Sequence, residues 1–239
     1  MLKRGNSITK KKSIIMLLCG ILGCICFGCG DRLMIYGDVT HNGSLYWLTN
    51  GTAQIPEWRN SLAMLLSFPG IVLYGTALFA ISDFIKENKN KKTYRILTSF
   101  GLTPWLSLHL FYLMILFLFS WLNGNGYADI AMPACEALFK HLSWIVTLSE
   151  VFMLAPFIYW FYLQITKKTV FPRASAFTNI LFIYAVMYII KMLLPDSPFR
   201  LDFTNGLMSK SMIIWFVIVF IWEKDVLRKV NYCNLSHKV

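Results

Sequence analysis

Three ionisable residues, Asp31, His109 and Glu150, stand within or at the ends of long apolar stretches of the sequence. A charged side chain in the hydrocarbon core of a membrane costs about 2.5–3.5 kcal/mol or more, so such residues usually serve a site or pair with one another. Helical spacing places Trp105 and Tyr112 on the same face as His109. We therefore expect the three residues to converge in one polar pocket, where their carboxyl and imidazole groups can bind a ligand or exchange protons.

Polar residues of the intervening loops are expected at the mouth of this pocket. The predicted ligand-binding set consists of Asp31, His109, Glu150, Arg59 and Asn205. The alternative is structural, because polar side chains in membrane spans also hold helices together through hydrogen bonds. Both interpretations stay open from the sequence.

Other kinds of chemistry find less support in the residue pattern. His109, His141 and Glu150 are too scattered to predict a metal site, since no two histidines lie four residues apart on one helix. Neither a phosphate-binding glycine loop nor a nucleophile at a diagnostic distance from a base is present. We predict no metal and no cofactor.

The elements that must position these residues are membrane-spanning helices. Of the 239 residues, 56% are hydrophobic and 15% are charged, against about 25% charged in soluble domains. A span needs about 20 apolar residues. The sequence predicts an all-α bundle, a single membrane domain over 1–239, with six spans near 13–30, 61–81, 96–122, 144–165, 174–194 and 207–222.

The basic residues predict the orientation of this bundle. Seventeen of the 23 lysines and arginines fall in the two termini and in the loops after the second and fourth spans. Such loops stay on the cytoplasmic side, so both termini are predicted to be cytoplasmic in a multi-pass protein of the cell membrane. The net charge of +11 then reflects topology and attraction to anionic membrane lipids, and no nucleic-acid partner is expected.

The opposite, outer side carries the longer loops. The segment 38–60 is long enough to form a small cap over the bundle, and its Tyr46, Trp47 and Trp58 are expected to anchor at the membrane interface. Glycine and cysteine at positions 20, 24 and 28 form a stripe of small residues along the first span. Such a stripe predicts close approach of a neighbouring helix.

Cys24 raises a question of processing. Ile21-Leu22-Gly23-Cys24 after a lysine-rich start resembles a bacterial lipoprotein signal, in which the cysteine is lipidated and becomes the first residue. A signal's apolar core is about 7–15 residues long, whereas this one continues through Phe27 and resumes at Leu33. We therefore predict that the first span is retained. The six cysteines otherwise serve as small apolar residues.

Several stretches spread over the chain resemble a family of uncharacterised bacterial multi-pass membrane proteins, a domain of unknown function. They occupy 30–38, 58–63, 101–105 and 194–206. The resemblance supports the fold and implies no activity, substrate or catalytic residue.

Three classes of function remain open. The first is binding or transport of a small ligand through the outward-facing pocket, which intramembrane charges and helix-interrupting prolines favour. A six-span transporter without an internal repeat is small, so a homo-oligomer is then expected. The second is an intramembrane enzyme acting on a lipid-type substrate, with Asp31, His109 or Glu150 as acid or base. The third is an accessory or sensor protein.

Overall fold

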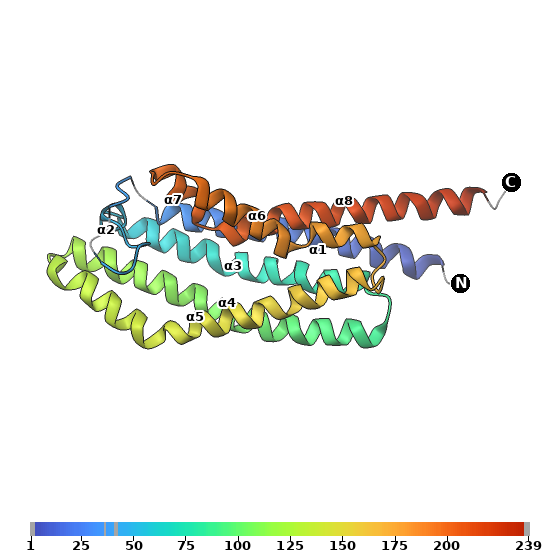
Figure 1. Ribbon diagram of the computed structural model, residues 1–239, viewed down its shortest axis with the longest axis horizontal. Helices are drawn as coiled ribbons and strands as arrows, with labels where there is room; N and C mark the ends of the chain where they lie inside the picture. The colour runs from blue at the N-terminus through green and yellow to red at the C-terminus, as the bar shows by residue number, and fades with distance from the viewer. Residues whose placement is uncertain (1–2, 36, 41–42, 237–239) are drawn as a thin grey trace.

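The chain folds into an elongated bundle of helices that run along one common axis (Figure 1). The computed structural model describes the backbone of residues 3–35, 37–40 and 43–236, and the side chains of 12–35, 37–40 and 43–224. Within these residues no strand occurs, only one isolated β-bridge. The six major helices are α1 (Lys3–Leu33), α3 (Glu57–Ile81), α4 (Asn88–Gly124), α5 (Ala128–Ile165), α6 (Ile180–Leu193) and α8 (Leu207–Ser236).

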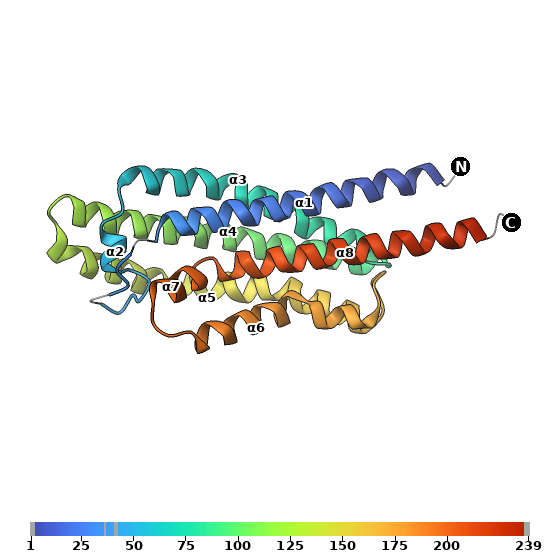
Figure 2. The same ribbon diagram turned by 90° about the horizontal axis from the view of Figure 1, so that it is seen from above.

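Four shorter helices lie in the connections between the major ones. They are α2 (Asn50–Ala53), η1 (Ser82–Phe84), η2 (Arg173–Thr178) and α7 (Pro198–Thr204). Both chain ends lie at one end of the bundle, together with the α3–α4 and α5–α6 connections, and α2 lies at the other end (Figures 1 and 2). We call these the terminal end and the cap end.

The major helices form a closed ring in which each helix contacts the next one in sequence, and α8 returns to α1. Helix α1 approaches α3 closely. A Cβ atom added to Gly20 would lie 2.2 Å from Ala77 Cβ, and one added to Gly23 would lie 2.6 Å from the backbone nitrogen of Tyr74. Gly28 has open space around it. Of the predicted stripe, Gly20 lies against α3 and Cys24 is buried, whereas Gly28 takes no part; Gly23, which the stripe did not include, makes the second close approach.

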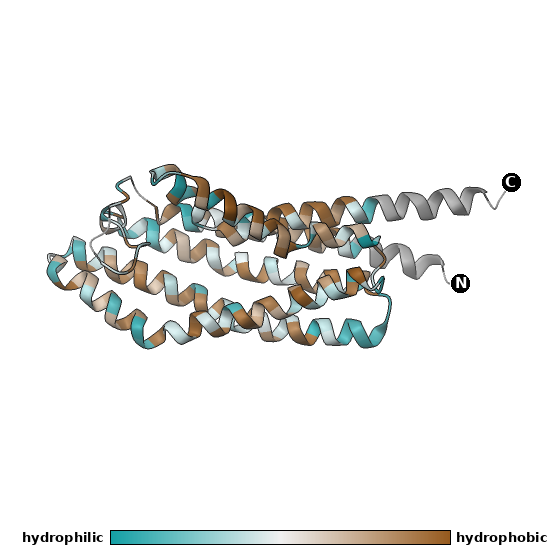
Figure 3. Ribbon diagram, in the orientation of Figure 1, coloured by the Kyte–Doolittle hydropathy of each residue, from teal (hydrophilic) through white to brown (hydrophobic). Residues whose placement is uncertain are grey.

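Apolar residues predominate along the middle of the bundle (Figure 3), and many of the large ones are exposed on its surface. Along one face of α3, for example, Leu65, Phe68 and Val72 are each more than half exposed. In water such a continuous apolar surface would be unfavourable, whereas lipid chains solvate it. Several apolar helices of this kind are the mark of a membrane protein.

In the part of the chain that the structure describes, four helical segments are long and apolar enough to cross a membrane: Lys12–Leu33, Glu57–Phe84, Asn88–Gly124 and Ala128–Ile165. A fifth is obtained when α7 and the following Leu207–Lys224 of α8, bent by 57°, are taken as one span. The expected span at 174–194 is divided instead, because Asn179 caps α6 by accepting a hydrogen bond from the Leu181 N–H (2.9 Å). This leaves η2 and the 14-residue α6 in its place.

Two connections at the terminal end are held together. Ile85 and Thr169 form the isolated β-bridge, in which Lys86 N donates to Lys168 O and Val170 N to Phe84 O, both at 2.9 Å. The α3–α4 and α5–α6 connections therefore form one unit.

The cap consists of the described residues 37–40 and 43–56, up to the start of α3 at Glu57. Asp38 organises it: its side chain accepts hydrogen bonds from Thr40 N (2.9 Å) and Asn50 Nδ2 (3.2 Å), and its carbonyl from Gly51 N (3.0 Å). Leu45 and Leu48 are buried against α4 and α5. The cap thereby closes one side of the bundle's end.

Candidate functional site

Asp31 and His109 meet inside the cap end of the bundle. Asp31 lies near the end of α1 and His109 near the middle of α4, and Asp31 Oδ1 lies 3.9 Å from His109 Nε2. The imidazole is held in place by Phe27, whose ring meets it edge-on with centroids 4.2 Å apart. At 3.9 Å the carboxyl and imidazole groups are too far apart for a direct hydrogen bond. Both can therefore bind a third polar group, such as one on a ligand.

A cavity of about 320 Å³, which we call the Asp31 cavity, contains this pair. Its volume is at the lower limit of typical small-molecule sites. Five aromatic side chains and the first residues of α8 surround it. It is lined by Asp31, Met34, Tyr46, Trp47, Trp105, Leu108, His109, Tyr112, Leu113, Leu116, Tyr184, Leu201, Thr204, Asn205, Gly206, Leu207, Met208 and Ser209.

The aromatic lining is fixed by packing within the cap and α4. Trp47 of the cap meets Tyr112 edge-on at 5.1 Å and also contacts Phe139 of α5 at 6.0 Å. Trp47 is thus drawn into the bundle, whereas Tyr46 and Trp58 are 60% and 62% exposed. The cap therefore supplies part of the cavity wall.

The turn between α7 and α8 closes the cavity next to Asp31. Gly206 adopts a positive φ of 67°, and an added Cβ would lie 2.6 Å from Asp31 Oδ2. A glycine is needed there both for the backbone conformation and for the contact. Lys210, one turn into α8, donates to the carbonyl oxygens of Phe203 (3.2 Å), Asn205 (2.9 Å) and Asp202, and this ammonium fixes the end of α7.

The structure brings together three of the five residues expected in the site. Asp31, His109 and Asn205 all line the Asp31 cavity. Glu150 is exposed on α5 and does not line it. Its charge nevertheless lies within electrostatic range of Tyr112 and Tyr184, two of the lining residues.

Arg59 lies in a different place. Its Nη2 donates to the carbonyl oxygens of Arg32 (3.3 Å) and Ile35 (3.0 Å) at the end of α1. It lines a separate groove of about 760 Å³ between α1, α3 and α7, together with the Arg32–Asp202 pair (3.6 Å). Arg59 thus caps the carbonyl groups of a helix end and has no place in the Asp31 cavity.

Sequence reasoning missed Tyr46, Trp47 and Tyr184 as cavity residues, and it missed Gly206. Asn205-Gly206 is a favoured turn dipeptide, which was a usable signal for a tight turn. The approach of that turn to Asp31 joins residues 175 positions apart in the chain and has no local signature.

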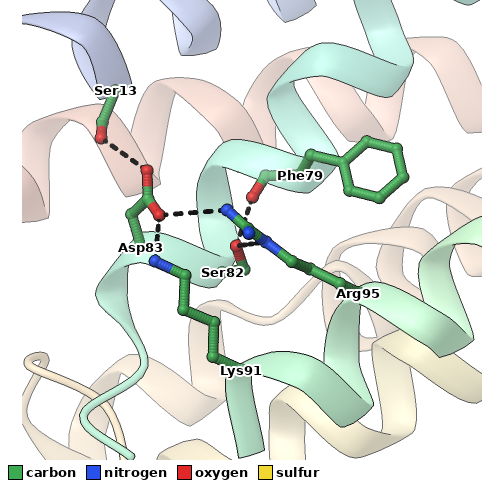
Figure 4. A network of polar contacts seen from close by, with 6 residues as sticks. All are labelled: Ser13, Phe79, Ser82, Asp83, Lys91 and Arg95. Atoms are coloured by element: carbon green, nitrogen blue, oxygen red, sulfur yellow. Dashed lines mark hydrogen bonds and ion pairs between the residues drawn. The ribbon is translucent and has the colours of Figure 1, made fainter. Parts of the chain in front are cut away.

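A second polar cluster lies at the terminal end, where Asp83 of η1 is surrounded by basic residues (Figure 4). Asp83 pairs with Lys91, and its Oδ1 lies 3.5 Å from Arg95 Nη2. Arg95 also donates to Ser82 Oγ (2.8 Å), and Ser13 of α1 donates to Asp83 Oδ2 (3.4 Å). These contacts tie α1, η1 and α4 together, which is a structural role.

Within the described residues, no group of three or more His, Cys, Asp or Glu side chains is placed to hold a metal ion. The site's chemistry rests on one carboxyl group, one imidazole and an aromatic wall.

Comparison with known proteins shows the family. No curated protein and no solved structure matches the chain. The model of a family of unknown function, DUF6796, matches residues 6–225, which include every residue that lines the cavity. The resemblance noted in the sequence to a domain of unknown function is confirmed, and the chain belongs to this family.

Proposed function

We propose that this chain is a six-span protein of the cell membrane, with both termini cytoplasmic, that binds a small ligand in the Asp31 cavity from the outer side. The observation that carries the binding function is the meeting of Asp31 and His109, 3.9 Å apart, in an aromatic cavity of about 320 Å³. Placing ionisable groups inside an apolar bundle is unfavourable in free energy, and a ligand that pairs with them offsets this unfavourable free energy.

The course of the chain supports six crossings. The connections after α3 and α5 lie at the terminal end, and the cap and the α4–α5 turn lie at the other (Figure 1). The crossing at 174–194, the fifth in chain order, needs both η2 and α6. Helix α6 alone has 14 residues and rises only about 21 Å, whereas the hydrocarbon core is about 30 Å thick. Residues 173–194 together are long enough.

The basic residues support the orientation. Lys86, Lys91, Arg95, Lys167 and Lys168 all belong to the terminal-end connections and the adjoining first turns of α4. By the positive-inside rule this end faces the cytoplasm, so the Asp31 cavity lies toward the outer side.

A route from the outer side to the cavity is supported by a neighbouring depression of about 530 Å³. It shares Tyr46, Leu201 and Thr204 with the Asp31 cavity, and its other lining residues include the exposed Asp196. A solute entering here passes the cap before it reaches Asp31. Release to the other side of the membrane, in a monomer or a homo-oligomer, would make the protein a transporter.

A blocking substitution tests the binding function. Ser209 lines the cavity, so Ser209→Trp should fill part of it, whereas Ser107→Trp, exposed on the outside of α4, should not. The purified protein in mild detergent is tested by thermal shift against cationic, anionic and neutral solutes of up to about ten heavy atoms. A bound solute raises the melting temperature. We expect stabilisation of the wild type and of Ser107→Trp by at least one solute class, lost in Ser209→Trp. Equal responses of all three proteins would contradict the proposal.

A further inference from the structure

The aromatic side chains that line the Asp31 cavity favour ligands of one sign of charge. Tyr46 and Trp47 of the cap, Trp105 and Tyr112 of α4, and Tyr184 of α6 present five aromatic rings from three parts of the fold. Aromatic faces carry partial negative charge and attract cations within about 6 Å of the ring centroid, most strongly when water is excluded. An aromatic wall contributed by separate elements encloses a ligand on several sides.

The acidic group of the cavity lacks hydrogen-bond donors. Among the described residues, no hydrogen bond ends on the Asp31 carboxyl group, and its ion-pair contact is with His109 at 3.9 Å. Gly206 covers one side of it without offering a side chain. A carboxylate removed from bulk water is unfavourable unless it is paired. The group best able to pair it, in the space that remains, is a cation inside the cavity.

Basic side chains of the cap end are placed elsewhere. The residues that line the cavity include no lysine and no arginine. Arg32 and Arg59 line the separate groove beside α1 and α3, and Lys191 and Arg200 line the outer depression. Lys210 lies within electrostatic range of Asp31, but its ammonium group is held by three carbonyl oxygens at the end of α7. Among the lining residues an anionic ligand would find neutral hydrogen-bond donors and the His109 imidazole, but no lysine or arginine to balance its charge.

We propose that the Asp31 cavity binds a small organic ammonium ion, with its charge against Asp31 and its alkyl groups against the aromatic wall. The proposal rests on the binding function proposed above and names the class of ligand. A cavity of about 320 Å³ holds a trimethylammonium group with a short side chain.

The test compares two probes of the same shape. Choline carries a trimethylammonium group, and 3,3-dimethyl-1-butanol has a neutral tert-butyl group in its place. Both are titrated into the purified full-length protein, with calorimetry and tryptophan fluorescence as readouts, since Trp47 and Trp105 line the cavity. We expect choline to bind at least tenfold more tightly than its neutral analogue, and Ser209→Trp to abolish this binding.

Two pairs of variants assign the effect to residues. Asp31→Asn should weaken choline binding at least tenfold and leave the neutral probe unchanged, while Asp202→Asn, whose carboxylate pairs with Arg32 in the separate groove, should change neither. Trp105→Leu should weaken choline binding more than Trp105→Phe, which keeps an aromatic ring. The second pair keeps the test available if Asp31→Asn fails to fold.

The outcomes separate the two proposals. If the neutral analogue, or propionate as an anionic probe, binds as tightly as choline in the wild type and is blocked in Ser209→Trp, the ammonium proposal is overturned and the binding function stands. If no probe and no solute of the panel gives a signal that Ser209→Trp removes, both are overturned.

Discussion

A Cβ atom on Gly206 would lie 2.6 Å from Oδ2 of Asp31, so these two residues meet in a contact that only glycine permits. The contact joins the start of α8 to the end of α1 and brings the α7–α8 turn against the carboxyl group. The shape of the cavity therefore depends on a residue without a side chain.

Gly206→Ala should destabilise the protein and displace Asp31. Holding alanine at a positive φ costs about 1–2 kcal/mol, and the clash with Asp31 adds to this. Gly126→Ala is the matched control, because Gly126 also has a positive φ, of 85°, with open space around it. Thermal melting in detergent should show a larger loss for Gly206→Ala than for Gly126→Ala. Equal losses would mean that the contact with Asp31 contributes nothing.

Gly23→Ala should disrupt the pairing of α1 and α3. The added Cβ would lie 2.6 Å from Tyr74 N and 2.7 Å from Gly70 O, which are backbone atoms that cannot rotate away. Gly28→Ala, on the same helix, meets nothing within 4 Å and should be neutral or slightly stabilising, since alanine favours helix by about 1 kcal/mol over glycine. Size-exclusion chromatography and melting temperature measure both effects. A Gly28→Ala protein as damaged as Gly23→Ala would contradict the helix pairing described here.

Asp83→Asn should lower stability by about 1–3 kcal/mol, between the values for exposed and buried ion pairs. The Asp83 side chain is 18% exposed and faces both Lys91 and Arg95. Asp196→Asn is the control, since Asp196 pairs with Arg200 but is 92% exposed, and the expected loss is below about 1 kcal/mol. Chemical denaturation of the two variants gives the comparison, and a larger loss for Asp196→Asn would refute the structural role of the Asp83 cluster.

The cap should loosen in acid. Hydrogen bonds from the Thr40 N–H and from Asn50 hold the pKa of Asp38 below its usual value of 3.8. A lowered folded-state pKa means that the stabilisation is present above about pH 4 and is lost as the pH falls through the folded pKa. The rate of cleavage within residues 43–53 in limited proteolysis should therefore rise as the pH falls below about 4. In Asp38→Asn the cleavage rate should be high already at pH 7 and vary less with pH; an unchanged pH profile would show that another group controls the cap.

The topology can be read with alkaline phosphatase fusions. Fusions after Gly51 and Asn125 should be active, and those after Lys91 and Lys168 inactive. The fusion after Ser197 decides the number of crossings: activity there means that residues 173–194 cross the membrane, and inactivity means that they do not. The reverse pattern at the first four sites would invert the proposed orientation.

Processing at Cys24 is checked by mass spectrometry of the intact protein. The Cys24 side chain is fully buried in α1, beside α3, and we expect an unmodified thiol within a retained first span. A diacylated Cys24 at a new N-terminus would remove α1 up to that residue and with it the close contacts of Gly20 and Gly23.

The sequence predicted those features of the fold that depend on local composition. Five of the six expected spans lie within helices of the structure, because about 20 consecutive apolar residues have few alternatives to a helix in lipid. The division of 174–194 depends on the helix N-cap formed by Asn179, and the extension of α5 from residue 144 back to Ala128 accompanies the packing of Ala131 and Cys135 against Leu45 and Leu48 of the cap segment. Neither is encoded in hydropathy.

The site was predictable only in part, for a similar reason. Asp31 and His109 stood out because their chemistry is rare within apolar helices. Glu150 has the same chemistry but lies on the outside of α5, and helical periodicity alone does not say which face of a helix turns toward the centre of a ring. Tyr184 and Gly206 reach the cavity through the tertiary fold.

The bridge between Ile85 and Thr169 has a consequence for motion. It fastens two neighbouring helical hairpins, α3–α4 and α5–α6, to each other at the terminal end, while at the cap end the cap residues and the α7–α8 turn meet through side chains. Helices joined in this way separate most easily at the free end. We therefore expect the bundle to widen around Asp31 at the cap end while the terminal end stays closed, so that a solute would exchange with the Asp31 cavity through the cap end.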